Sequence, residues 1–154
     1  MTGGKGFGMF YWVLTAHLLG AAIWTGGHLV LAVSVLPRAL RAGSPQILTD
    51  FEAGFERIGI PALLVQVASG LWLAYAVAPD WRAWFAFDDA VSGAVAVKLI
   101  LLAMTAGLAL NARFRVIPNL SAETLPLMGW HIRAVTLFSI LFVMAGAFIS
   151  TGGW

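Results

Sequence analysis

Four long apolar runs alternate with short polar segments along the chain. They cover residues 9–36, 58–78, 90–112 and 127–151, and nearly all charged residues lie between them. At ~1.5 Å rise per helical residue, each run can cross the ~30 Å of hydrocarbon in a bilayer. Backbone polar groups in lipid must be satisfied within the segment, which favours helices. The pattern therefore predicts an all-α integral membrane four-helix bundle that forms a single domain over residues 1–154.

The connecting segments carry their own patterns. In residues 46–58, apolar side chains recur at helical spacing on one side of the predicted helix, and acidic and basic side chains lie on the opposite side. This pattern predicts an interfacial helix leading into the second span. Residues 79–89 mix Trp81, Trp84 and Phe85 with charges, which is typical of an aromatic belt at the lipid headgroups.

Basic residues gather at one end of the predicted bundle. We name side A the end with both termini and the loop 79–89, and side B the end with the other two loops. Side B holds six arginines: Arg38, Arg41, Arg57, Arg113, Arg115 and Arg133. The positive-inside rule makes side B cytoplasmic, so both termini are expected on the periplasmic or exterior side of a bacterial inner membrane.

Composition agrees with a lipid environment and narrows the chemistry. The 154 residues are 60% hydrophobic and 10% charged, with a net charge of +2 and no cysteine. So little charge argues against a nucleic-acid partner. Without thiolates, a metal must be held by histidine, methionine, carboxylate or backbone, and histidine is the strongest of these ligands here. The first apolar run exceeds the ~7–15 residues of a signal-peptide core, so it is expected to stay as a span.

Two of the three histidines share one face of the first span. His17 and His28 are eleven residues apart, which is close to three whole helical turns, and Trp24 lies in the stripe between them. Gly27 flanks the stripe, where a small residue admits either a neighbouring helix or a flat ligand. Ionisable groups inside spans are costly and usually functional, although a neutral histidine bonded to a carbonyl of the next helix is the structural alternative.

His131 begins the fourth span on side B, in the same half of the bilayer as His28. Two imidazoles from different helices of a bundle form a good axial pair for haem b. Arg38, Arg113 and Arg133 belong to the same end and could bind haem propionates, or could simply obey the positive-inside rule.

A second polar site is expected nearer side A. His17 and Lys98 lie at similar depth in the first and third spans. Lys98 either faces His17 or extends its ammonium to the interface. Gln66, Ser69 and Thr105 add polar groups to the same interior.

The first span, AHLLGAAIWTGGHLVLAVSVLP, resembles the opening helix of the copper-resistance protein D (CopD) family. His17, Trp24, Gly26, Gly27, Leu36 and Pro37 match its motif, whereas His28 and His131 lie outside it. The third span, through Lys98 and Leu99, also looks similar to that family and to the related HemJ-type protoporphyrinogen oxidases, and the GAFISTGG end looks similar to the last helix of the CopD family. The resemblance implies a helical membrane bundle, with copper uptake in the first family and haem b bound through His17 in the second.

The favoured interpretation is a haem b protein ligated by His28 and His131, with an electron-transfer role and a quinone or a redox protein as partner. A membrane oxidoreductase fits this interpretation, but the sequence names no catalytic residue. One alternative is a copper-handling protein that uses His17, Trp24, His28 and Met104 without haem. Another is a non-catalytic membrane anchor or assembly subunit. The oligomeric state is open, and a homo-oligomer is compatible with all three.

Overall fold

The computed structural model describes the backbone of residues 3–151 and the side chains of residues 8–151. Every regular element in this part of the chain is helical. The longer elements are α1 (Gly3–Val30), α2 (Leu36–Ala42), α3 (Gln46–Val77), α4 (Ala90–Asn111) and α5 (Leu125–Ser150). The shorter ones are η1 (Leu31–Val35), η2 (Ala83–Phe85), η3 (Ala112–Val116) and η4 (Ile117–Asn119).

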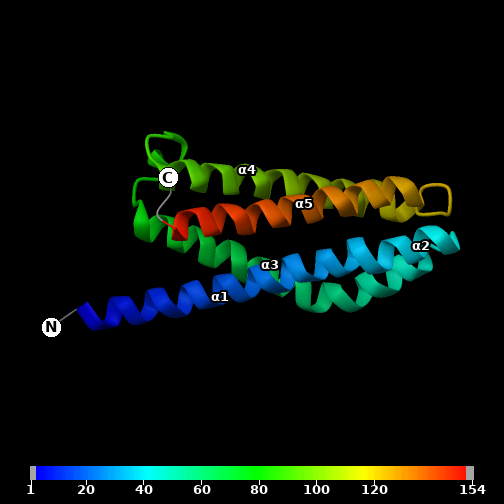
Figure 1. The fold of residues 1–154 in the computed structure, drawn as a ribbon, viewed down its shortest axis with the longest axis horizontal. Coiled ribbons are helices and arrows are strands. Elements are labelled where there is room, and N and C mark those ends of the chain that lie inside the picture. Colours follow the sequence, from blue (N-terminus) through cyan, green and yellow to red (C-terminus); the bar gives the residue numbers. More distant parts are fainter. Residues whose placement is uncertain (1–2, 152–154) are drawn as a thin grey trace.

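Four helical stretches of the described chain are long and apolar enough to cross a membrane, which confirms the predicted four-span fold. They run over Gly8–Ala42, Gln46–Val77, Ala90–Asn119 and Leu125–Ser150. Both ends of the described chain and the loop 78–89 lie at one end of the bundle, side A (Figure 1). Which compartment that end faces stays a prediction.

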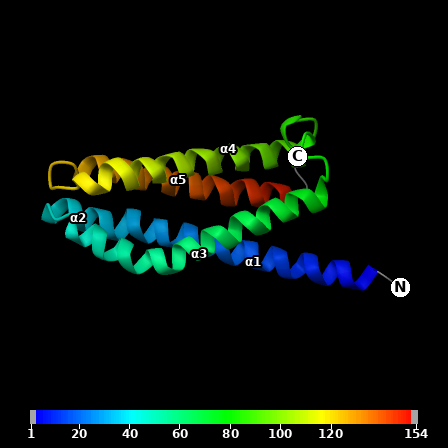
Figure 2. The ribbon, with the colours of Figure 1, turned by 180° about the vertical axis from the view of Figure 1, so that it is seen from behind.

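Three boundaries differ from the sequence prediction. The first helical stretch continues past residue 36 to Ala42, and the third continues past residue 112 to Asn119. The segment 46–58 is helical, but it is the first part of α3 rather than a separate interfacial helix. Pro61 lies inside α3 and does not end it. A proline removes one backbone hydrogen bond and bends a helix without stopping it when both flanks are helical, and α3 is visibly bowed (Figure 2).

Two π-helical turns explain how the first and third stretches pass their prolines on side B. In η1 the N–H of Leu36 bonds to the carbonyl of Leu31, and in η3 the N–H of Ile117 bonds to the carbonyl of Ala112. Each closing residue directly precedes a proline, Pro37 or Pro118. A proline has no backbone N–H to donate within a helix. A π turn accommodates one extra residue with hydrogen bonds of longer spacing, so the helical chain can continue through the proline.

The helices associate as two pairs. α1 packs along α3, α4 packs along α5, and α1 also meets α5. Among the described residues, the backbone of α3 comes close to the backbone of α4 or α5 at hardly any position. The core cluster lies on side B, where residues of η1, α2, α3, η3 and α5 are buried together: Leu31, Val35, Leu36, Ala39, Leu48, Ala112, Val116, Leu125, Met128 and Ile132.

Candidate functional site

His17 faces α3, and one of its ring nitrogens is held by that helix. Its Nδ1 lies 2.9 Å from the backbone carbonyl oxygen of Gln66 and 3.2 Å from Oγ of Ser69. A carbonyl oxygen only accepts hydrogen bonds, so Nδ1 carries the proton and donates it. In the neutral ring this leaves the lone pair on Nε2, which bonds to none of the described residues. Such a carbonyl contact orients metal-binding histidines in many proteins.

Two glycines make this arrangement possible. A Cβ added to Gly20 of α1 would lie 2.8 Å from the carbonyl oxygen of Ala62, so the glycine lets α1 approach α3 closely. A Cβ added to Gly70 of α3 would lie 2.9 Å from Cε1 of His17. The imidazole therefore occupies space that only glycine leaves open.

His17 lines a cavity of about 650 Å³ between the two helix pairs, which we call the large chamber. This volume lies within the ~300–1,000 Å³ typical of ligand and cofactor sites. Its walls are mostly apolar and come from all four long helices, for example Leu14, Val95 and Phe142. The other functional side chains on its wall are Gln66 and Lys98.

Lys98 enters this chamber from α4. A Cβ added to Gly146 of α5 would lie 3.3 Å from the Lys98 Nζ, so this glycine leaves room for the ammonium group. Within the described residues the ammonium forms no ion pair. The structure thus places His17 and Lys98 in the lining of one cavity, from different helix pairs.

His28 occupies a different environment. Its Nδ1 donates to the carbonyl oxygen of Trp24, 2.9 Å away in the same helix. The ring lies 4.3 Å from the Trp24 ring and meets Phe55 of α3 edge-on at 5.9 Å. Gly27, predicted as a cofactor contact, lies directly against the Phe55 ring. The imidazole of His28 is therefore part of an aromatic contact between α1 and α3.

His131 turns toward α4. Its Nδ1 lies 3.0 Å from the carbonyl oxygen of Leu127, and its Nε2 lies 3.0 Å from Oδ1 of Asn111. Nδ1 must donate to the carbonyl, so a neutral ring accepts at Nε2, and the Asn111 amide then presents its nitrogen rather than its oxygen. Sequence reasoning missed Asn111, although an asparagine at the end of an apolar run signals a polar partner.

The structure does not bring His28 and His131 together as an axial pair. Thr136 of α5 donates to the carbonyl oxygen of His28 at 3.2 Å, so these two residues share one level. His131 lies five residues nearer side B, or about 7.5 Å along the helix. The two rings also face different helices, α3 and α4. Residue numbers predicted that His28 and His131 lie at similar depth in the bilayer. The direction in which each ring points depends instead on how its helix is rotated about its own axis.

The three arginines proposed for propionates lie at the opposite end from the large chamber. Arg38 is exposed on α2. Arg113 forms an exposed ion pair with Glu56 at 3.2 Å, and the guanidinium of Arg133 lies 5.6 Å from the Trp130 ring centroid. Their positions suit the ends of spans and the lipid headgroup region.

The residues proposed for copper are also apart. The Met104 side chain is 48% exposed and lines neither the large chamber nor the other cavity of the described bundle. Across the part of the chain that the structure describes, no three His, Asp or Glu side chains gather as a metal site.

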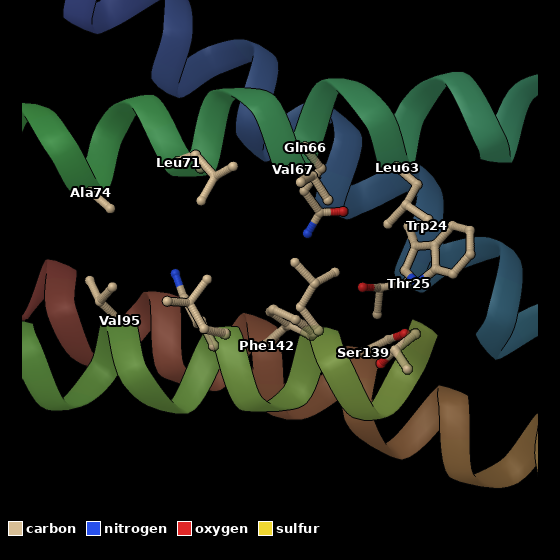
Figure 3. Close-up of a pocket in the computed structure, with 15 residues that line it drawn as sticks. Trp24, Thr25, Leu63, Gln66, Val67, Leu71, Ala74, Val95, Ser139 and Phe142 are labelled. Carbon is tan, nitrogen blue, oxygen red and sulfur yellow. The ribbon is translucent and has the colours of Figure 1, made fainter. Parts of the chain in front are cut away.

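A smaller cavity of about 90 Å³, the small chamber, lies between α3 and α4, with Gln66 projecting into it from α3 (Figure 3). Gln66 and Lys98 line both chambers, as do Gly70, Ala74, Val95 and Phe142. Side A of the bundle therefore contains a two-part cavity, and His17, Gln66 and Lys98 are the imidazole, amide and ammonium groups among the described residues that line it. No protein-family model, no curated protein and no solved structure matches this chain.

Proposed function

We propose that this protein binds haem b in the large chamber, with His17 as an iron ligand, and that it has a redox role in the membrane. The single observation that carries the proposal is the His17 side chain. Its Nδ1–H is held by the Gln66 carbonyl at 2.9 Å, and its Nε2 bonds to no described residue. Of the three histidines, it is the one that lines an apolar chamber of cofactor size.

The other residues of the large chamber also fit a haem group. Apolar side chains exclude water from a macrocycle, and Phe10 and Phe142 offer aromatic surface to it. Lys98 is the basic residue on the described wall and would hold a haem carboxylate. Haem bound here would supply one-electron chemistry at iron, and His17 would hold the iron through Nε2. Ser69 adds a hydroxyl beside Nδ1, which helps to keep the imidazole in this orientation.

The experiment compares the three histidines. The protein is expressed with haem supplied, purified in detergent, and its absorption spectrum is recorded oxidised and then reduced. We expect a Soret band with one haem per chain, lost in His17→Ala and kept in His28→Leu and His131→Leu. The two leucine variants are matched controls, because they also remove an imidazole from a span.

Two results would contradict the proposal. A wild-type sample without a Soret band rejects haem binding, and stoichiometric copper in that sample would favour the copper-handling alternative. A Soret band that is lost in His28→Leu and His131→Leu but survives His17→Ala would return the ligands to the pair predicted from the sequence.

A further inference from the structure

The small chamber has features that the haem proposal does not use. It lies where α3 and α4 scarcely approach each other, and its walls come from Leu63, Val67 and Leu71 on one helix and Leu99 and Leu102 on the other. Leu71 is 42% exposed, so the chamber reaches the lipid-facing surface of the bundle. A molecule dissolved in the bilayer could enter between these two helices.

Gln66 points into this chamber with a free polar atom. The side chain is 9% exposed, and its Oε1 has no hydrogen-bond partner among the described residues. Figure 3 shows the amide projecting from α3 toward α4 and α5, between the two walls. Leaving a buried amide oxygen unpaired costs about 1–3 kcal/mol, and such an atom in a native structure calls for a partner. A ligand in the chamber would supply that partner.

The chamber walls restrict the chemistry of the ligand. None of the described residues that line it is acidic, so it does not suit a cation. Gln66 and Lys98 offer N–H donors, which suit carbonyl oxygens. Trp24 and Phe142 offer aromatic rings, which suit a flat molecule. A fatty-acid carboxylate would lie at Lys98 and only accepts hydrogen bonds, so this ligand has no second form that donates to the Gln66 Oε1.

We infer that the small chamber binds the ring of a lipid-soluble quinone, with the Gln66 amide as its hydrogen-bond partner. The amide nitrogen donates to a carbonyl oxygen of the quinone. In the reduced form, a hydroxyl of the ring donates to the orphaned Oε1. One side chain therefore recognises both oxidation states. The inference concerns a second ligand and goes beyond the haem proposal, because no residue it uses ligates iron.

The test measures binding of decylubiquinone to the detergent-purified full chain. Quenching of tryptophan fluorescence reports the contact, since Trp24 lines the chamber. We expect Gln66→Leu to weaken binding by up to about tenfold, the effect of losing one good hydrogen bond. Gln46→Leu is the matched control, because it removes the other glutamine of the same helix, which bonds to Asp50 outside the chamber. Equal affinity in Gln66→Leu and wild type would overturn the inference.

A second variant works from the opposite wall and does not alter the amide. Leu102→Trp fills the small chamber from α4 and should abolish decylubiquinone binding. Retained binding in this variant would reject the chamber as the site, and binding of palmitate without any binding of decylubiquinone would reject the ligand class. Haem content is measured on the same samples. Quinone binding without haem would reject only the haem proposal, and haem binding without quinone would reject only this inference.

Discussion

The two halves of the bundle differ in how their interior is filled. On side B, apolar side chains from five elements are buried together, and Leu36, Ala39 and Leu48 have no exposed surface. On side A, the helix pairs enclose a two-part cavity, and polar residues such as Gln66 and Ser69 replace large apolar ones at buried positions. Side B therefore provides the close packing that holds membrane helices together, and side A contains the cavity proposed as a binding site.

The difference also shows what keeps a cavity open between membrane helices. A Cβ added to Gly129 on side B would lie 3.3 Å from a methyl carbon of Leu36. The Leu36 side chain therefore fills the space beside this glycine. Gly70 and Gly146 on side A instead make room for the polar ends of His17 and Lys98. Small residues thus allow dense packing in one half and leave room for polar groups that line a cavity in the other.

The largest expected effect tests the packed half. Leu36→Ala should lower the free energy of unfolding by about 2–5 kcal/mol, because it leaves a void in a filled core. Leu18→Ala is the matched control in the hollow half, where the side chain lines the large chamber and is 57% exposed, so we expect a smaller loss. Thermal unfolding followed by circular dichroism in detergent gives both values. Equal losses would erase the distinction between the halves.

An intermediate effect is expected from filling the hollow half. Gly70→Ala places a methyl group 2.9 Å from Cε1 of His17, so the imidazole must move away from the Gln66 carbonyl. We expect a loss of about 1–3 kcal/mol in unfolding free energy from overpacking, together with reduced haem occupancy. Gly107→Ala is the control, because an added Cβ there meets nothing within 4 Å. Unchanged haem occupancy in Gly70→Ala would show that haem binding does not depend on the position of the His17 imidazole.

The smallest effect concerns the polar link between α4 and α5 on side B. Asn111→Ala removes the partner of the His131 Nε2 and should cost about 1 kcal/mol, the net value of one hydrogen bond. His131→Leu should cost a similar amount, and the double variant should cost little more than either single one, because both remove the same bond. The same unfolding measurement decides this. Fully additive losses would show that the two side chains act separately.

The candidate site was only partly accessible to sequence reasoning. Depth along a span follows from residue number, so His17 and Lys98 could be placed at one level, and both line the large chamber. Depth alone also placed His28 near His131, but their rings face α3 and α4. Phe55 accounts for part of this difference, because its ring fills the space beside Gly27 and contacts His28. Nothing in the hydropathy pattern specifies such a contact.

The sequence by itself determined that the chain is helical and has four segments able to span a membrane. Apolar length and composition are properties of each segment alone, and a backbone in lipid has few ways to satisfy its hydrogen bonds. Only the tertiary structure decided that α1 packs along α3 and α4 along α5, which side chains meet across them, and where the bundle is hollow. Each residue turns a helix by ~100°, so a modest rotation about the helix axis redirects an imidazole to another neighbour, and that rotation is set by packing between helices.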